Sequence, residues 1–228
     1  MRIGLMLTAG LALTLGTALP AEAQFKPGKA DQIKLGRQAS QQVRQKERVL
    51  PSHDPRVQTL RRVADRLLST VSPNPRDEPW EYTFDVIDNK QINAFALPGG
   101  PIYFYTGLLD RLQTEDQLAG ILAHEIMHIR NEHWASAYND NQKRQLGIGV
   151  LLTLLRANRT AFDIAGVADT LVFTLPYSRR HETEADERGM DMMIRAGYNP
   201  MGMADVFRIL DQAAGGGRAP EFLSSHPD

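Results

Sequence analysis

The pattern of apolar and polar positions predicts helices at both ends of the chain and a small sheet near the middle. Residues 56–71 carry apolar side chains at helical spacing with charged residues on the opposite face, so we expect a helix there. A sparser pattern of the same kind over residues 30–48 predicts an amphipathic surface helix. Residues 80–86 alternate between apolar and polar side chains, which is typical of a half-buried strand.

Two more strands and a series of helices complete the predicted fold. The apolar stretches 92–97 and 102–105 flank a Pro-Gly-Gly-Pro turn, which predicts a hairpin. From residue 107 onward nearly the whole chain is helix-forming, and its apolar stretch at 146–155 is too short to cross a membrane, so we expect a buried helix there. The prediction is an α+β fold that is predominantly helical.

The last two helices carry recognisable end signals. A helix over residues 179–196 should stop at Gly197, because glycine adopts the left-handed conformation common at helix ends. Asn199 and Pro200 then suit the first positions of a final helix. Three glycines at 215–217 predict a flexible break before the C-terminal tail.

The N-terminal segment is typical of a secretory signal peptide. An apolar run follows Arg2 and leads to Ala21-Glu22-Ala23, a small-residue cleavage pattern. A membrane anchor is the alternative, but threonines and glycines interrupt the run, which is marginal for the ~20 residues of a span. We expect cleavage of residues 1–23, which leaves a domain of residues 24–228 in the periplasm with no membrane span.

Composition narrows the chemistry that this chain can perform. With 42% hydrophobic and 23% charged residues, the 228-residue chain has the composition of an ordinary globular protein. Its net charge of −1 provides no field for binding nucleic acid or an anionic membrane. The absence of cysteine excludes disulfides, thiolate metal sites and a cysteine nucleophile. Any metal ion must therefore be held by His, Asp or Glu.

One helix carries an H-E-x-x-H motif, formed by His124, Glu125 and His128. Thr114 and Gln117 form a capping-box pair at the predicted start of this helix. Four residues apart, the two imidazoles lie within about 40° of each other and can bind one cation, while Glu125 can reach a water on it. The alternative is a solvated helix face. The surrounding residues are so apolar, however, that unpartnered burial of these three side chains would be costly.

A catalytic zinc site needs a third protein ligand. The metzincin pattern is excluded, because Asn131 and Trp134 stand where that pattern requires Gly and His. His133 lies about 140° around the helix from His128, so we expect a surface residue that cannot join the site.

A second predicted helix offers a better third ligand. Glu182 and Asp186 are four residues apart and share a helix face. One of these carboxylates can bind the metal, with Glu182 the better candidate, while the other accepts a hydrogen bond from a ligand imidazole. The alternative is a charged surface helix with ion pairs between residues four apart.

Four blocks of this sequence resemble, in the same order, those of the HtpX-type zinc endopeptidases, peptidase family forty-eight. The blocks are residues 93–100, 105–109, 124–128 and 178–186. HtpX-type proteins have transmembrane helices that this chain lacks, so the chain is more similar to the soluble periplasmic, BepA-like branch. Family members commonly continue beyond the position of Asp228, where this sequence ends.

The resemblance implies a zincin-like fold with one zinc ion held by His124, His128 and Glu182. It also implies Glu125 as the general base and Asp186 as the hydrogen-bonding partner of a ligand. Zinc would polarise the scissile carbonyl and activate a water, while Glu125 passes the water proton to the leaving amine.

The expected function is therefore hydrolysis of peptide bonds in exported proteins of the cell envelope that are misfolded or mislocalised. Expected partners are polypeptide substrates and the outer-membrane assembly machinery. One alternative is a periplasmic chaperone or binding module with a structural metal site, and a weaker one is a metal hydrolase that acts on other substrates. Glu125 favours hydrolysis, because a structural site needs no carboxylate beside an open coordination position.

Substrate binding and oxyanion stabilisation are less well defined by the sequence. An extended peptide could pair with the strand formed by Asn93, Ala94, Phe95 and Ala96, although that strand could equally be ordinary sheet interior. Tyr103, Tyr177 and Arg179 are three candidates for stabilising the oxyanion.

The C-terminal stretch around His226 resembles a segment of the periplasmic branch whose histidine can occupy the open position of zinc in a latent state. We hypothesise that His226 is a reversible, autoinhibitory fourth ligand. The alternative is a solvated histidine in a mobile tail.

Overall fold

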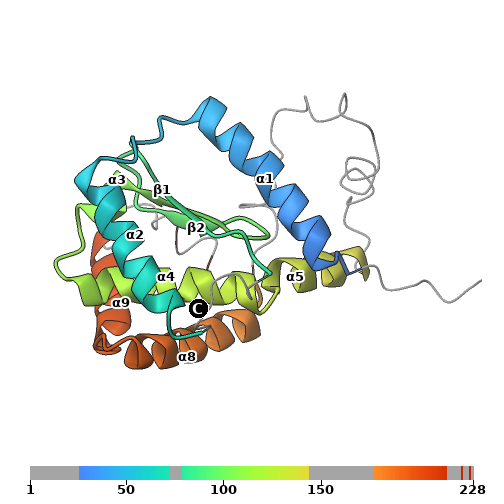
Figure 1. The fold of residues 1–228 in the computed structure, drawn as a ribbon. Helices are drawn as coiled ribbons and strands as arrows, with labels where there is room; N and C mark the ends of the chain where they lie inside the picture. The colour runs from blue at the N-terminus through green and yellow to red at the C-terminus, as the bar shows by residue number, and fades with distance from the viewer. Residues whose placement is uncertain (1–25, 72–78, 144–176, 215–221, 223–225, 227–228) are drawn as a thin grey trace, which may run out of the picture.

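The computed structural model describes residues 26–71, 79–143, 177–214, 222 and 226 (Figure 1). The predicted signal peptide, the predicted helix at 146–155 and the glycines at 215–217 lie outside these residues. None of the helices in the described part combines the length and the apolarity that a membrane crossing requires.

In the residues that the structure describes, the fold is predominantly helical with a small three-stranded sheet, as the sequence predicts. In chain order, the elements are α1 (Lys29–Lys46), α2 (Pro55–Leu68), β1 (Thr83–Ile87), β2 (Ala94–Ala96), β3 (Pro101–Tyr105), α3 (Thr106–Leu109), α4 (Glu115–Arg130), α5 (His133–Lys143), α8 (Arg179–Arg195) and α9 (Met201–Ala214).

The sheet has the strand order β1-β3-β2. β2 and β3 form the predicted antiparallel hairpin, with Phe95 opposite Tyr103. Gly99 and Gly100 make its turn, and their φ angles of 83° and 144° lie where side chains other than glycine are strained. β1 pairs with β3 in parallel, and Thr83 lies opposite Pro101.

Both faces of the sheet are covered by helices. Phe84 and Phe104 point into the cluster shared with α2 and α4, whereas Ile87 and Tyr103 point into the cluster shared with α1 and α5. The expectation that β1 is half-buried is therefore wrong, and the strand begins at Thr83 instead of residue 80.

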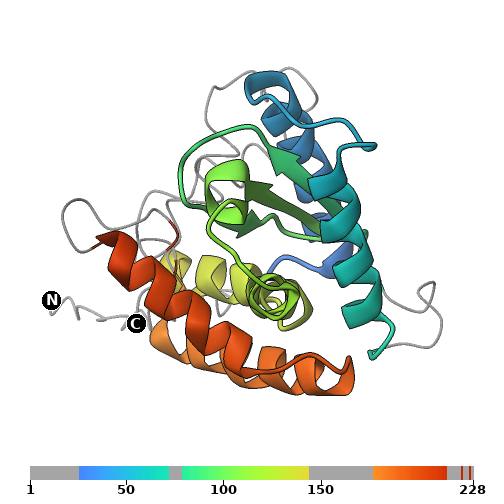
Figure 2. The ribbon, with the colours of Figure 1, turned by 90° about the vertical axis from the view of Figure 1, so that its left-hand side faces the viewer.

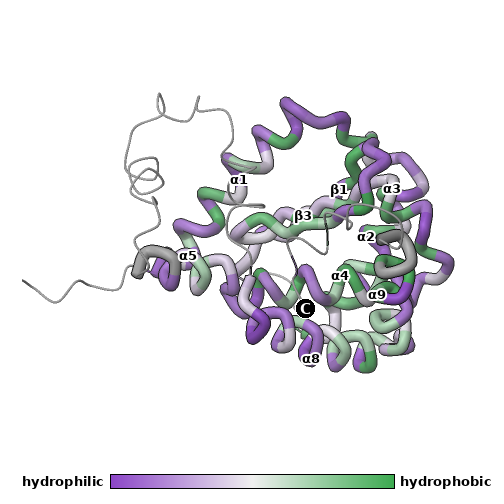
Figure 3. Tube along the Cα trace, turned by 180° about the vertical axis from the view of Figure 1, so that it is seen from behind, coloured by the Kyte–Doolittle hydropathy of each residue, from purple (hydrophilic) through white to green (hydrophobic). Residues whose placement is uncertain are grey.

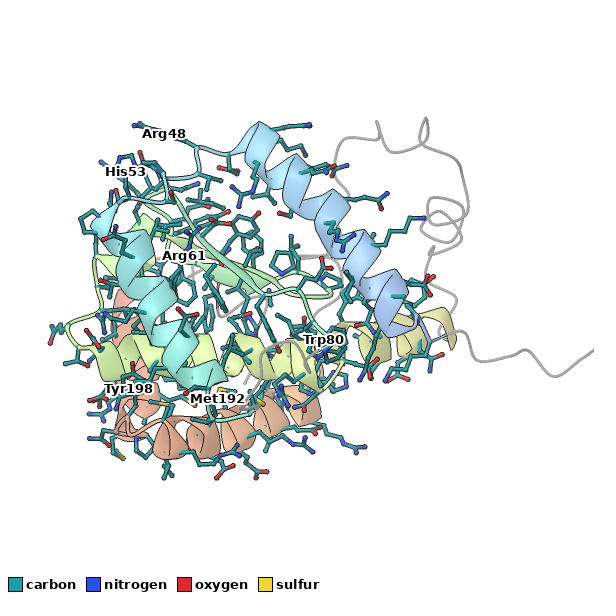
Figure 4. All side chains as sticks on the ribbon, viewed as in Figure 1. Arg48, His53, Arg61, Trp80, Met192 and Tyr198 are labelled. Carbon is teal, nitrogen blue, oxygen red and sulfur yellow. The ribbon has the colours of Figure 1, made fainter. Side chains whose placement is uncertain are left out.

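The one acidic side chain of β1, Asp85, is buried between α1 and α2 with 3% of its surface exposed. Arg44 from α1 and Arg61 from α2 both donate hydrogen bonds to its carboxylate. Figure 4 shows Arg61 between α2 and the sheet. A charged residue is tolerated in the layer between strand and helices because two cations neutralise it.

Helix α4 lies at the centre of the molecule, between the sheet and the pair of helices α8 and α9 (Figure 2). Residues from Gln117 to Ile129 are all buried, which agrees with the apolar composition of this helix. Figure 3 shows hydrophobic residues gathered where elements face one another and hydrophilic residues on the outer turns of α1 and α8. A central, desolvated helix therefore carries the H-E-x-x-H motif.

Close backbone contacts set the position of α4 against its neighbours. A Cβ atom at Gly120 would lie 2.8 Å from the Cα atom of Met203 in α9. A Cβ atom at Gly189 of α8 would lie 3.3 Å from the backbone nitrogen of His124. Glycine at these two positions lets α8 and α9 approach α4 more closely than side chains would permit.

The predicted signals at the ends of the last two helices are confirmed. Gly197 follows the last turn of α8 with a φ angle of 74°, in the left-handed region. The side chain of Asn199 accepts a hydrogen bond from the backbone nitrogen of Met201, at the start of α9. Local capping chemistry thus fixes where the chain turns from α8 into α9.

Candidate metal centre

The start of α4 fixes which of its side chains face α8. The Thr114 side chain accepts a hydrogen bond from the backbone nitrogen of Gln117, as predicted. The Gln117 side chain in turn accepts from the backbone nitrogen of Gln113, one residue before the expected partner. From this cap, regular helix carries His124 and His128 to the same side.

Helix α8 presents the acidic residues from the opposite side. The Ser178 side chain caps its first turn by accepting from the backbone nitrogen of His181. Glu182, Ala185 and Gly189 form the buried stripe of this helix, and the small residues let it pack against α4. The glutamate one turn into the helix therefore points at the histidines.

Four side chains converge on one point between these helices. His124, His128, Glu182 and His226 each offer one ligand atom, and these atoms all lie within 4.8 Å of one another. Nε2 of His124 lies 2.9 Å from Nε2 of His128 and 3.3 Å from a Glu182 oxygen. Nδ1 of His226 lies 3.1 Å from the same carboxylate. Two imidazoles and a distant carboxylate are thus brought together, as the sequence predicts.

The chemistry of this donor set fits a zinc ion. Neutral imidazole nitrogens and a carboxylate oxygen are the ligands that catalytic zinc sites use. The buried carboxylates of Glu125 and Glu182 face imidazoles: Nε2 of His226 lies 3.3 Å from a Glu125 oxygen, and Nε2 of His128 lies 3.6 Å from a Glu182 oxygen. Glu125 is 1% exposed, and a cation nearby would offset the desolvation of these carboxylates.

The buried imidazoles and carboxylates of the cluster shift one another's pKa values. Burial favours a lower pKa for His124, but hydrogen bonds to Asp186 and Glu182 raise it to about 10. Burial and the neighbouring histidines hold the pKa of His128 well below its usual value. Burial favours a higher pKa for Glu182, but His124 and His226 lower it to about 2. These opposite shifts arise because imidazoles and carboxylates are packed together in a desolvated space.

Asp186 lies where the sequence predicts a hydrogen-bonding partner for a ligand. Its Oδ1 atom is 2.8 Å from Nδ1 of His124, the ring nitrogen that faces away from the cluster. A carboxylate in this position fixes the tautomer of the imidazole, leaving Nε2 with its lone pair toward the other ligands.

The expectation that His133 is a surface residue is wrong. His133 is 2% exposed, and its Nδ1 atom lies 3.0 Å from Nδ1 of His128. His133 would lie about 140° from His128 only in one continuous helix, but α4 ends at Arg130 and a new helix begins at His133. The apolar side chains of Trp134 and Tyr138, which also point inward, were the signal for a second buried helix face here.

Of the three candidates for oxyanion stabilisation, only Tyr177 contacts the cluster. Its ring stacks on that of His128 with a centroid distance of 4.0 Å and an interplanar angle of 17°. Burial raises the pKa of Tyr177, and the charges of Glu125 and Glu182 raise it further, so its hydroxyl remains a proton donor. The Tyr103 hydroxyl is instead hydrogen-bonded to Ser40, and Arg179 is exposed at the start of α8.

The predicted substrate strand lies at the edge of the described sheet. Asn93 precedes β2, and both polar atoms of its fully buried side chain lack a partner. Tyr105 donates to the Asn93 carbonyl and Leu97 donates to the Pro101 carbonyl. Because backbone groups alternate along a strand, those of Ala94 and Ala96 point away from β3.

Comparison with known proteins agrees with this geometry. The family described as "Peptidase family M48" matches residues 54–228. The beta-barrel assembly-enhancing protease of Escherichia coli (strain K12) is 34% identical over 154 residues, which are 64% of this chain and 32% of that protein. The mitochondrial metalloendopeptidase OMA1 of Schizosaccharomyces pombe is 32% identical over 186 residues, covering 79% of this chain and 52% of the relative.

The chain spans about a third of the length of the first of these relatives and about half of the second. A third relative, metalloendopeptidase OMA1 of Danio rerio, is 31% identical over 198 residues, which are 80% of this chain and 40% of that protein. The family match covers the H-E-x-x-H helix, the helix that carries Glu182, and His226. On this evidence, the chain belongs to peptidase family M48.

Proposed function

We propose that this chain is a zinc-dependent endopeptidase. The observation that carries this proposal is Glu125, whose buried carboxylate lies next to a convergent set of metal-binding side chains and faces one of them, His226, at 3.3 Å. A structural metal site has no use for such a group, whereas a hydrolase needs a base at this position. Family membership and the metalloendopeptidase names of the relatives support the same activity.

In this proposal, His124, His128 and Glu182 hold the ion. Zinc, when bound, supplies a Lewis acid that polarises a carbonyl and lowers the pKa of a water towards ~7. Asp186 keeps His124 in the tautomer that directs Nε2 at the ion. The apolar residues of α4 exclude bulk water from the site and so strengthen these interactions.

Glu125 acts as the general base. It accepts a proton from the attacking water and delivers it to the nitrogen of the leaving amine, so a single carboxylate serves both halves of the reaction. The Tyr177 hydroxyl is our candidate for donating a hydrogen bond to the developing oxyanion, since this side chain lies against His128.

Substrate binding is proposed at Asn93, Ala94, Phe95 and Ala96. Ala94 and Ala96 direct backbone donors and acceptors away from β3, where an extended peptide could add a strand. Such binding uses the main chain of the substrate and is therefore tolerant of sequence. A peptide N-methylated at one residue of its extended segment should bind more weakly than the unmethylated peptide, and equal affinities would contradict binding at this edge.

His226 is proposed as the autoinhibitory fourth ligand. It is 5% exposed, and its Nε2 atom lies 3.3 Å from a Glu125 oxygen while Nδ1 faces Glu182. In this position the imidazole lies between the proposed base and the proposed ligands, where the attacking water would otherwise bind. The imidazole of His226 would therefore have to leave this position before a substrate is cleaved.

We further propose that the substrates are exported proteins of the cell envelope that are misfolded or mislocalised. The signal-peptide pattern at residues 1–23 supports a periplasmic location for residues 24–228. The name of the beta-barrel assembly-enhancing protease supports a partnership with outer-membrane assembly machinery, although this chain covers only a third of that relative.

The decisive experiment compares casein digestion by the wild-type protein and by Glu125→Gln, both loaded with zinc to the same measured stoichiometry. We expect equal zinc binding, and activity lower by about 10²–10⁴-fold in the variant, because general-base catalysis contributes that much. A zinc-loaded protein that digests casein neither as the wild type nor as His226→Ala, or equal activity in the wild type and Glu125→Gln, would contradict the proposal. The first result would favour a chaperone or binding module with a structural metal.

A further inference from the structure

Each of the two histidines of H-E-x-x-H has a polar partner at its outer ring nitrogen. For His124 this partner is Asp186, at 2.8 Å. For His128 it is the imidazole of His133, whose Nδ1 atom lies 3.0 Å from Nδ1 of His128. The two rings are buried, with exposed fractions of 1% and 2%, and they meet edge to face at 75°. This contact therefore occurs without competition from bulk water.

The residue before His133 has a left-handed backbone conformation, which helps to place His133 against His128. Glu132 lies between α4 and α5 with a φ angle of 53°, and it is the one non-glycine residue with positive φ in the described part of the chain. The Gln32 side chain from α1 donates a hydrogen bond to its carboxylate. An uncommon backbone conformation persists where the surrounding structure maintains it, and here its effect is to turn His133 back toward the helix it follows.

The far side of His133 is also held in place. Its Nε2 atom lies 3.5 Å from a Glu184 oxygen, and Glu184 is in turn paired with Arg188 at 2.9 Å. The His181 ring stacks on the His133 ring with a centroid distance of 4.6 Å. The imidazole is thus confined by α8 on one side and by His128 on the other.

The direction of the hydrogen bond follows from the metal site. Nε2 of His128 faces His124 and Glu182, so binding a metal there leaves the ring proton on Nδ1. That proton needs an acceptor. Nδ1 of His133 has a lone pair to accept it when the proton of His133 is on Nε2, the atom that faces the negative charge of Glu184.

We propose that His133 is a positioning residue for the metal centre, accepting the Nδ1 proton of His128 as Asp186 does for His124. This inference rests on the proposed metal site. Hydrogen-bonding partners of ligand histidines typically account for 10–100-fold in metal affinity. The His128–His133–Glu184 series would fix the tautomers of two rings and keep Nε2 of His128 directed at the ion.

The first test measures zinc affinity of the full chain by competition with a chelator. His133→Phe keeps a ring and removes the acceptor, so we expect affinity to fall by about 10–100-fold. His133→Asn places an oxygen acceptor where Nδ1 was and should recover most of that loss. His53→Phe is the matched control, because His53 is exposed on the loop between α1 and α2, away from α8 (Figure 4). Affinity for His133→Phe equal to that of the wild type would overturn the proposal.

The second test needs no substitution, so it holds even where a variant fails to fold. In zinc-loaded wild-type protein with nitrogen-15 histidine, NMR should detect a proton on Nδ1 of His128 and a coupling through the hydrogen bond to Nδ1 of His133. A proton on Nε2 of His128, or no coupling between the two rings, would overturn the proposal.

The two proposals fail in different ways. If the wild type binds no zinc, the metal centre and this inference are both wrong. If the wild type binds zinc and digests casein, while the coupling is absent and His133→Phe keeps full affinity, only the role of His133 is wrong.

Discussion

His124 and Asp186 meet across the contact between α4 and α8, with Nδ1 of the imidazole 2.8 Å from Oδ1 of the carboxylate. These residues belong to different helices and lie far apart in sequence, yet the contact is as short as a charge-assisted hydrogen bond. It fixes the outward face of the histidine ring and so determines what the inward face can bind.

We predict that Asp186→Ala weakens zinc binding by about 10–100-fold, because His124 loses the acceptor that fixes its tautomer. Asp186→Asn should have a smaller effect, since its amide oxygen can still accept the proton. The zinc affinities of both variants are measured by competition with a chelator. Glu187→Ala is the control, because Glu187 is exposed on the next position of α8. Equal affinities for Asp186→Ala and the control would show that the contact does not support the site.

His226→Ala should increase peptide hydrolysis at equal zinc occupancy. Removing the imidazole frees the position next to Glu125 and Glu182 that it fills in the structure. Turnover of casein, normalised to bound zinc, is the measurement. Unchanged or lower turnover would argue that His226 does not restrain the enzyme.

Asp85→Ala should lower the free energy of unfolding by about 2 kcal/mol, because Arg44 and Arg61 both lose a charge-assisted hydrogen bond to a buried carboxylate. Asp88→Ala, which breaks an exposed pair with Arg48, should cost less than about 1 kcal/mol. Urea unfolding compares the two. If Asp85→Ala and Asp88→Ala lower the free energy of unfolding equally, burial does not strengthen the ion pairs of Asp85.

Gly120→Ala should lower the free energy of unfolding by about 1–3 kcal/mol, the range typical of overpacking. Its new methyl group would lie 2.8 Å from the backbone of Met203, so α9 must shift away from α4. Gly28→Ala is the control, since there the methyl group would meet only an Asp31 oxygen at 3.7 Å. A melting temperature unchanged by Gly120→Ala would show that the two helices separate at no cost.

The stability contributed by Asp54 should depend on pH. Asp54 caps α2, and hydrogen bonds from the Arg56 side chain and backbone lower its pKa to about 2. A carboxyl group with a lowered pKa stabilises the fold above its unfolded pKa of about 3.9, and this contribution is lost as the pH falls through about 2. Asp54→Asn retains a capping oxygen and does not titrate. The difference in melting temperature between wild type and variant should therefore be largest above pH 5 and shrink toward pH 2.

A constant difference between the two melting temperatures over this range would mean that the ionised carboxylate contributes nothing beyond its capping oxygen.

Much of the fold follows from local sequence signals. The apolar periodicity of α2, the cap of α4, the Pro-Gly-Gly-Pro hairpin and the end of α8 at Gly197 are each encoded within a few residues, and the structure has each of them. The parallel pairing of β1 with β3 was not predicted, because two strands separated in sequence carry no local mark of their register. The burial of Asp85 also depends on contacts distant in sequence, so the alternation of apolar and polar residues around it did not predict that burial.

For the candidate site, the sequence by itself determined that His124 and His128 share a face, since a spacing of four residues is close to one turn of any helix. Only the tertiary structure decided that Glu182, His226 and His133 lie within reach of them. These approaches depend on glycines that let helices touch and on one left-handed residue between two helices. Such features act through space and leave no periodic pattern along the chain, so they become visible only when the chain is folded.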